Sequence, residues 1–403
     1  MNDISLRASY GYQANVAENY GPDLILKYPT GAAINTYTGG NVLQLSQLPY
    51  GNLRPEKTQT FNLGLDFSLL NARINGSIDY YVKNSKDLIT FKDIPYENGV
   101  TSMPINVGTL YNRGIDIALN FIPIRNKNFT WALGIVTSRN INKITSNQYS
   151  NPTWLTASSG NYYVNGYATG SFWVFDFAGL DSTSGMPKYN IPTVAQNPSA
   201  KTDATAYMKY AGRMTPDFTG NFNTTFSYKR LTVSTNFYMS FGGKKLLAPL
   251  YTNEISNNTP NEYNNYSADL VNRWRKPGDE KTTNIPSLPQ YGPSTNFITL
   301  PTGGVTAING VLQAASTSVY ALYNFSSLRV VDATYFRINN INVSYNIPDS
   351  WAKKVFSKRL FVTYTVSNPF TFVNKDYKGR DLEVASGSQP LSVSHVISIS
   401  ATF

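Results

Sequence analysis

Hydrophobic and polar residues alternate most regularly between Leu53 and Tyr81. Every odd residue from Phe61 to Leu69 is apolar, whereas the even residues between them are asparagine, glycine, aspartate and serine. After a three-residue turn the phase reverses, and Ile74 begins a row of even-numbered apolar residues that one glycine interrupts. A period of two over this length predicts two long strands that form a β-hairpin with one apolar face.

The same alternation recurs along the chain and predicts ten long strands. We expect them at residues 4–12, 59–69, 73–83, 110–121, 129–140, 216–229, 231–242, 334–347, 358–368 and 392–403. Their connections alternate between short turns and long loops, and the long loops are residues 13–58, 84–109, 141–215, 243–333 and 369–391. This asymmetry is typical of an outer-membrane barrel, whose short turns face the periplasm. A wall strand at residues 171–190 would break this alternation of short turns and long loops, so we assign that segment to a hairpin inside the loop 141–215.

The two faces of the predicted strands differ in chemistry. The polar rows carry asparagine, serine, glycine and aspartate, whereas the solvent face of a secreted β-sandwich normally carries many lysines and glutamates. Aromatic residues such as Phe61, Phe67 and Tyr80 stand at the ends of the apolar rows. Outward apolar rows, inward polar rows and aromatic belts favour an all-β, antiparallel transmembrane barrel wall. A secreted carbohydrate-binding β-sandwich is the alternative.

The composition narrows the class of protein further. Charged residues make up 14% of the chain, which has 29 tyrosines, 21 phenylalanines and a mean hydropathy of -0.28. No run of 18 apolar residues occurs, so the sequence is not that of a helical membrane protein. The absence of cysteine excludes a disulfide scaffold and a cysteine-based metal or redox site. The net charge of +10 is spread in short clusters without a continuous basic stripe, so we expect no nucleic-acid partner.

Several segments, taken in order, resemble one family. The stretch from Leu53 to Ile89 is similar to the L-x-P-E-x-(S/T)-x-x-x-x-x-G-x-D hairpin of the SusC/RagA-like, TonB-dependent outer-membrane transporters. Further segments that resemble this family are residues 106–119, 131–145, 213–231, 273–279 and 332–348. The resemblance covers essentially the whole chain, and it corresponds to the C-terminal part of such a transporter.

The resemblance implies a fold, a location and partners. It implies that residues 1–403 are part of the β-barrel domain of a TonB-dependent receptor with about 22 strands, without the plug and the signal peptide. It further implies a place in the outer membrane of a Gram-negative cell, in contact with lipid. The implied partners are a SusD-like surface lipoprotein over the external loops and the TonB complex, which the missing N-terminal part would contact. The implied function is uptake of an oligosaccharide or peptide cargo, with no cofactor. A non-transporting outer-membrane adhesin or receptor is the alternative.

Candidate site residues follow from the two faces and from the loops. Inward polar residues would line the passage, and the candidates are Asn62, Asp66, Arg73, Asn75, Asp79 and Asp116. The long loops mix tyrosine and tryptophan with amide and hydroxyl residues, a composition that suits stacking on sugar rings or peptide groups. The cargo-contact candidates are Trp154, Tyr162, Tyr163, Trp173, Tyr251, Tyr263 and Trp274. The alternative is that these aromatic side chains pack the loops onto one another.

The C-terminal part of the chain carries two further structural signals. The connection 347–359 predicts a short amphipathic helix at the periplasmic rim, with Asp349 or Ser350 as its cap and Trp351 at the depth of the membrane interface. The chain ends on an apolar row that finishes at Phe403, which resembles the signal read by the barrel-insertion machinery.

The sequence gives little support for a catalytic site or a metal site. The single histidine, His395, lies on the apolar row of the last strand and has no cysteine or second histidine with which to share a metal. A glycoside hydrolase would need a carboxylate pair, for which Asp376, Asp381 and Glu383 are the candidates. The chain contains no G-x-S-x-G motif, and Gly242 to Lys245 lacks the spacing of a phosphate-binding loop. We therefore expect no enzyme and no metal site.

Overall fold

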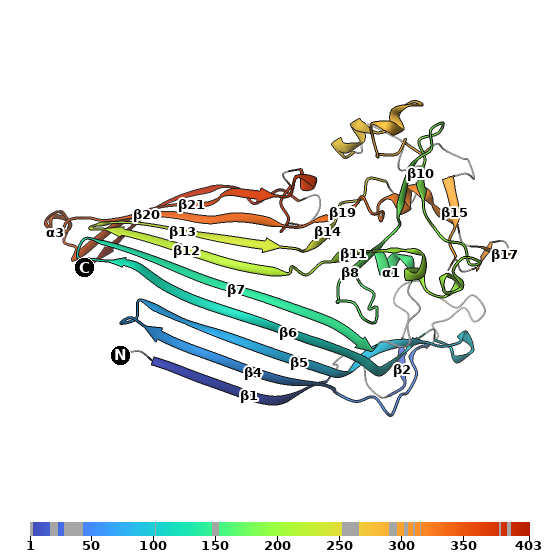
Figure 1. Ribbon diagram of the computed structural model, residues 1–403, viewed down its shortest axis with the longest axis horizontal. Helices are drawn as coiled ribbons and strands as arrows, with labels where there is room; N and C mark the ends of the chain where they lie inside the picture. Colours follow the sequence, from blue (N-terminus) through green and yellow to red (C-terminus); the bar gives the residue numbers. More distant parts are fainter. Residues whose placement is uncertain are drawn as a thin grey trace.

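The computed structural model describes residues 3–16, 23–27, 43–100, 102–146, 153–251, 266–289, 296–301, 305–308, 311–314, 316–378, 380–384 and 388–403. Ten long strands form one antiparallel sheet, and most of the other elements gather at one end of it, whereas α3 (Asp349–Ala352) lies at the opposite end (Figure 1). The strands, in their order across the sheet, are β1 (Asp3–Asn15), β4 (Glu56–Leu69), β5 (Ile74–Asp93), β6 (Ser102–Arg125), β7 (Phe129–Ser146), β12 (Phe218–Tyr228), β13 (Leu231–Phe241), β20 (Tyr335–Asn346), β21 (Arg359–Val373) and β22 (Ser394–Thr402). The prediction of ten strands, each paired with the next along the chain, is confirmed.

The register places the apolar rows on one face and the polar rows on the other. On β4 and β5, Leu65 lies opposite Ile78 and Asp66 lies opposite Ser77, so like residues meet across the hairpin. The apolar rows of the two edge strands are uncovered, and Ile4 and Ile399 are each 70% exposed. Among the described strands β1 pairs with β4 and β22 pairs with β21, so the sheet is not closed. A sheet with this open apolar face suits contact with lipid.

One predicted loop is largely strand. Residues 84–109 were expected to be a long connection, but β5 runs to Asp93 and β6 begins at Ser102, so the hairpin continues well beyond the expected wall. A β-bulge explains the error. The register shifts between Ser85 and Leu88, and Asp87 adopts a left-handed backbone with φ of 58°. The bulge changes the phase of the alternation, which hides the continuation in the sequence.

The long connections fold into a compact body at one end of the sheet, which we call the loop body. Its strands are β8 (Ser171–Val174), β9 (Phe177–Leu180), β10 (Pro187–Tyr189), β11 (Lys209–Arg213), β14 (Lys244–Leu246), β15 (Phe297–Thr299), β16 (Val305–Ile308), β17 (Val311–Ala314), β18 (Ser316–Ser318) and β19 (Val330–Asp332). Its helices are α1 (Trp154–Ser158) and α2 (Val319–Tyr323), with 3-10 turns at Pro198–Lys201, Ala204–Tyr207, Ala268–Asn272 and Asp279–Lys281. The strands β9 and β10 form a hairpin outside the wall, as the parity of the connections predicts for residues 171–190.

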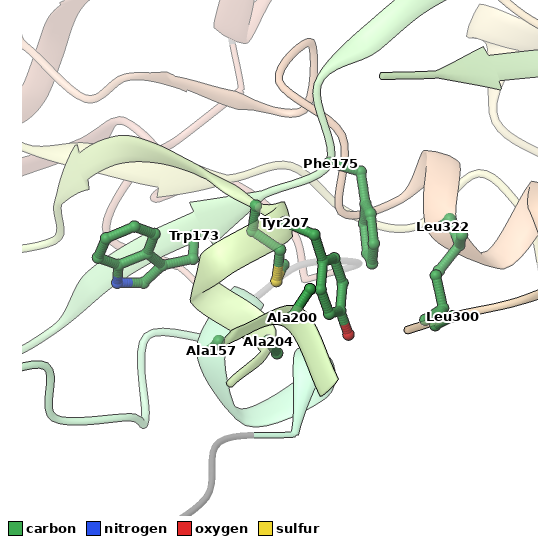
Figure 2. Close-up of a cluster of buried hydrophobic side chains, with 9 residues drawn as sticks. Ala157, Trp173, Phe175, Ala200, Ala204, Tyr207, Leu300 and Leu322 are labelled. Atoms are coloured by element: carbon green, nitrogen blue, oxygen red, sulfur yellow. The ribbon is translucent and has the colours of Figure 1, made fainter. Parts of the chain in front are cut away.

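The most deeply buried side chains lie in the loop body. Figure 2 shows one buried cluster, in which the rings of Phe175 and Tyr207 face each other with centroids 6.3 Å apart and Leu322 of α2 lies nearby. A second cluster forms around Tyr251, Leu270 and Tyr320. The loop body therefore has its own hydrophobic core, which stabilises its shape independently of the wall.

Shorter elements complete the chain. The first long connection contains β2 (Ile25–Lys27) and β3 (Gln44–Gln47). A 3-10 turn at Tyr96–Asn98 joins β5 to β6, and another at Lys375–Tyr377 follows β21. The predicted short helix is confirmed as α3 (Asp349–Ala352), which a 3-10 turn at Lys353–Val355 continues.

The expected cap of α3 is wrong. Pro348 occupies the N-cap position and no side chain caps the helix, because proline with its preset φ already starts the turn. The side chain of Trp351 is exposed, as an interface position would require. No helix in the described ranges is long and apolar enough to cross a membrane.

Candidate functional site

Charged side chains on the polar face of the first strands form an ion-pair network. The Arg7 guanidinium contacts the Asp66 carboxylate through Nε and, at 3.0 Å, through Nη2, and its Nη2 lies 3.3 Å from Asp79 Oδ1. Gly64 leaves the space for this network, because a Cβ there would lie 2.6 Å from Asp79 Oδ1 and 2.9 Å from Arg7 Cζ. The structure thus joins two predicted residues, Asp66 and Asp79, through a third that the sequence analysis missed. The place of Arg7 on the polar row of β1 was the available signal.

The remaining lumen candidates are distributed along the same face. Asp116 lies opposite Asp79 across β5 and β6 and accepts a hydrogen bond from Ser138 at 2.5 Å. Asn75 and Asp66 both line a shallow cavity of about 410 Å³ on this face. Asn62 lies opposite Ser9 of β1. Arg73 belongs to the turn before β5 and is exposed at the short-turn end, two residues from Asn75.

Most of the loop aromatics predicted to contact cargo are packed inside the loop body. Trp173 and Trp274 are each 7% exposed and Tyr251 is 2% exposed. Trp154 and Tyr162 pack against the cluster of Figure 2. Of the six candidates in the described part of the chain, Tyr163 is the exposed one, and it lines a cavity of about 190 Å³ at the rim of β5, β6 and β7. Tyr263 lies outside the described residues.

The buried aromatic side chains pack against other segments of the loop body. The Tyr251 hydroxyl donates a hydrogen bond to the Pro286 carbonyl at 2.7 Å, and the Trp154 ring lies 5.5 Å from the ring of Phe325. Burial raises the pKa of Tyr251 above its usual value, with nearby Tyr323 as a further cause. These contacts join segments that are far apart in the sequence, so these side chains hold the loop body in one shape. Direct contact with cargo remains a proposal for each of them.

The last long connection is anchored to the wall by a buried arginine, in a group that we call the Arg337 cluster (Tyr335, Arg337, Asp381 and Glu383). Arg337 of β20 has a side chain that is 3% exposed. Its Nη2 donates to Asp381 at 2.6 Å, its Nη1 pairs with Glu383, and its Nε donates to Thr371 at 3.1 Å. The Tyr335 hydroxyl also donates to Glu383. A planar guanidinium with several donors in a fixed geometry suits such a buried junction.

A second set of ionic contacts joins the last connection to the loop body. Lys378 Nζ lies 2.5 Å from Asp269 Oδ1, and Arg380 approaches the other oxygen of Asp269 at 3.8 Å. Lys245, next to the wall, donates a hydrogen bond to the carbonyl of Leu382. Residues 375–378 and 380–384 are therefore held between the wall and the loop body by side chains from both.

The acidic cluster considered for catalysis has a structural role in this arrangement. Asp381 and Glu383 both pair with Arg337, whereas Asp376 is exposed and lies within the 3-10 turn at Lys375–Tyr377, where its amide donates to the capping Asn374 side chain at 3.0 Å. Burial by itself raises the pKa of Asp381, but the Glu383 amide and the Arg337 guanidinium outweigh it and hold that pKa below its usual range. A carboxylate of this kind stays ionised and paired at neutral pH.

His395 and Phe403 lie on the last strand. The Tyr364 hydroxyl and His395 Nδ1 are 2.7 Å apart, and the two rings stack on the apolar row. No group of three or more histidine, cysteine, aspartate or glutamate side chains in the described ranges could hold a metal ion. Phe403 is 74% exposed, and its role as an insertion signal remains a prediction.

Two sequence comparisons agree on the kind of protein that this chain is similar to. The family model described as TonB dependent receptor-like, beta-barrel matches residues 1–238. TonB-dependent receptor P3 of Formosa agariphila is 27% identical over 395 residues, which cover 94% of this chain and 35% of that relative. TonB-dependent receptor SusC of Bacteroides thetaiotaomicron is 28% identical over 415 residues, which cover 96% of this chain and 36% of SusC. The chain spans little more than a third of the length of these curated relatives.

Solved structures share the fold. The structure of the RagAB peptide transporter covers 100% of this chain with 41% of its own chain, at a TM-score of 0.72 and 22% identity. The RagAB peptide importer in its "open-open" state gives a TM-score of 0.70 at 24% identity. At this level of identity the likeness establishes the fold, which includes both the wall and the body of long connections.

Proposed function

Because this chain belongs to the TonB dependent receptor-like β-barrel family, we propose that it serves in the import of oligosaccharides or peptides across the outer membrane. The chain is an outer-membrane β-barrel segment of the SusC-like type. The observation that supports the transport proposal best is the ten-stranded wall with an open apolar face and a polar face that carries Arg7, Asp66, Asp79 and Asp116. Such a wall separates lipid from an aqueous passage.

The proposal assigns a direction to the two ends of the wall. Long connections of outer-membrane barrels face the outside and short turns face the periplasm. The loop body would then meet cargo first, and α3 with Trp351 would lie at the periplasmic rim. We further propose that residues 1–403 form part of the barrel domain of a longer receptor.

The proposed partners follow from the family. A SusD-like surface lipoprotein would cover the loop body, and the TonB complex would supply energy from the periplasmic side. The cargo class is open between two possibilities. The resemblance to the SusC/RagA-like transporters implies an oligosaccharide or a peptide, and one structure with the same fold is titled a peptide transporter.

Growth of a deletion strain tests the transport proposal. The gene is deleted from its host, and growth is measured on a mixed oligosaccharide pool and on a mixed peptide pool as sole carbon sources. We expect the deletion strain not to grow on one of the two pools and the full-length gene to restore that growth. The complemented strain should again fail to grow on that pool when TonB is absent. Unchanged growth on both pools, together with loss of surface binding, would identify a non-transporting adhesin or receptor instead. Co-purification of a lipoprotein with the tagged receptor tests the partner.

A further inference from the structure

A cavity of about 550 Å³ lies between the last long connection and the chain that follows β14. Residues 245–250 form one side, and Tyr377, Arg380, Asp381 and Val384 of the last long connection line the other. Lys245 joins the two sides through its hydrogen bond to the Leu382 carbonyl, while the Arg337 cluster and the Lys378–Asp269 ion pair hold the second side in place. The cavity has the size of a site for a small ligand or for one end of a longer one.

Seven of the fourteen described residues that line the cavity are apolar. Leu246, Leu247, Pro249, Leu250 and Pro390 line it, and the hydroxyl side chains on it are Ser267 and Ser388 besides two tyrosines. A sugar presents hydroxyl groups all around its ring, and those that meet the leucine and proline side chains would lose hydrogen bonds to water without replacement. An aliphatic side chain loses nothing there and is stabilised by burial.

Two cations on the same cavity have spare capacity for an anion. Arg380 has a side chain that is 43% exposed, and its described ion pair is the 3.8 Å contact with Asp269, longer than a hydrogen bond. Lys245 donates one hydrogen bond to the Leu382 carbonyl, although an ammonium group has three donors. Asp269 already has Lys378 as a close partner at 2.5 Å. An incoming carboxylate would therefore replace a weak contact of Arg380 rather than a strong one.

The charges behind the wall also favour an anion. Asp381, the one carboxylate on the cavity, is neutralised by Arg337 at 2.6 Å. Arg329 is 5% exposed, donates to the Ala248 carbonyl in the cavity wall, and has an Nε without a hydrogen-bond partner among the described residues. A buried guanidinium that is only partly satisfied adds positive potential at close range.

We propose that this cavity binds the C-terminal residue of a peptide cargo, with the terminal carboxylate on Arg380 and Lys245 and an aliphatic side chain against Leu247 and Leu250. This inference rests on the proposed import function and deepens it, because it selects peptide over oligosaccharide at this site. Tyr377, whose ring lies 5.7 Å from Lys245 Nζ, holds the ammonium group over its face. Specificity would come from the carboxylate and from an apolar last residue together.

Isothermal titration with the full-length receptor in detergent tests the site without any substitution. The probes are a tetrapeptide of three alanines and a C-terminal leucine, the same peptide with an amidated C-terminus, and maltotetraose. Loss of a charge-assisted hydrogen bond costs about tenfold or more in affinity, so we expect the amide to bind at least about tenfold more weakly than the free acid. Equal affinity of acid and amide would overturn the proposal, and so would competition of maltotetraose with the peptide.

Arg380→Gln assigns the effect to the cavity. We expect this variant to weaken binding of the free acid by about tenfold or more, to the level of the amide, while binding of the amide is unchanged. Arg54→Gln is the matched control, because Arg54 is exposed, pairs with Asp87 at 3.3 Å and lies on another connection. An unchanged affinity of Arg380→Gln for the free acid, or an equal loss in Arg54→Gln, would overturn the assignment.

The outcome is separable from that of the growth experiment. If peptides support growth through this receptor but acid and amide bind equally, the cavity assignment fails and the import function stands. If deletion of the gene leaves growth on both pools unchanged, the import function fails, and the acid-to-amide ratio still reports on the cavity.

Discussion

Replacing Arg337 with methionine should release the last long connection from the wall without unfolding the sheet. The side chain is 3% exposed, and its guanidinium contacts Asp381, Glu383 and Thr371 at once. Methionine fills a similar volume with flexible apolar atoms, so the variant removes the charge and the donors and leaves little empty space. The backbone of β20 keeps its ladder to β13 and β21.

The size of the effect follows from burial. Removing one partner from a buried ion pair costs about 3–5 kcal/mol, because the other charge is left without compensation. Glu383 is 41% exposed and can regain water, whereas Asp381 is 6% exposed and cannot do so without opening. We therefore expect the lower end, about 3 kcal/mol, which corresponds to roughly a hundredfold larger population of the detached connection.

Hydrogen–deuterium exchange of the full-length receptor measures this population locally. The informative amides are those of Arg380, which donates to the Tyr377 carbonyl at 3.1 Å, and of Glu383, which donates to Asp381 at 3.0 Å. We expect both to exchange roughly a hundredfold faster in Arg337→Met, with the amides of the sheet unchanged. Arg230→Met is the control, because Arg230 is 40% exposed and 3.8 Å from Asp349, a kind of pair that contributes little. Unchanged protection at Glu383 would refute the reasoning.

Three further predictions follow from other contacts. Gly64→Ala should displace the Arg7–Asp79 ion pair and lower the free energy of unfolding by about 1–3 kcal/mol. Gly11→Ala is the control, because a Cβ at Gly11 meets nothing within 4 Å and should leave stability unchanged. Urea unfolding followed by gel mobility compares the two variants. The pKa of Asp381 is lowered in the folded state, so its contribution to stability is present above the unfolded pKa of about 3.9 and is lost as pH falls through the folded value. Protection of the Glu383 amide from exchange should therefore not change through titration of Asp381 between about pH 5 and 8, and it should be lost below about pH 4. A loss of protection already at about pH 6 would contradict this assignment. Asn106→Ala should destabilise the long hairpin by about 2–3 kcal/mol. The Asn106 side chain accepts a hydrogen bond from the Arg54 backbone amide at 2.7 Å and donates to the Arg54 and Asp87 carbonyls at 2.8 and 2.7 Å. Hydrogen–deuterium exchange in residues 88–93 measures the change, and protection equal to that of the parent would exclude this role.

The wall could be predicted because its determinant is local. A strand with one apolar and one polar face repeats every two residues, and short turns force sequence neighbours to pair. The boundaries failed where the pattern is interrupted, as at the bulge beside Asp87, because one extra residue reverses the phase of the rows. The N-cap of α3 failed for a similar reason, since Pro348 starts the turn without any side-chain hydrogen bond.

The composition of the loops does not predict which of their aromatic side chains are exposed. Tyr251, Trp274 and Tyr163 occur in similar polar surroundings in the sequence, yet the first two are buried and Tyr163 is exposed. Their burial depends on contacts between segments more than 30 residues apart, such as the Tyr251 hydroxyl on the Pro286 carbonyl. No periodic pattern encodes such contacts, so the sequence indicates aromatic loops but not which rings face outward.

The sequence by itself therefore determined the class of wall, its ten strands and which rows share the apolar or the polar face, because alternation acts between adjacent residues and adjacent strands. Only the tertiary structure decided that Arg7 joins Asp66 and Asp79, that Arg337 neutralises Asp381, and that Arg380 is left facing a cavity. These are pairings of charges across strands and connections, and the pairing of a charge is set by distances that arise only when remote segments fold together.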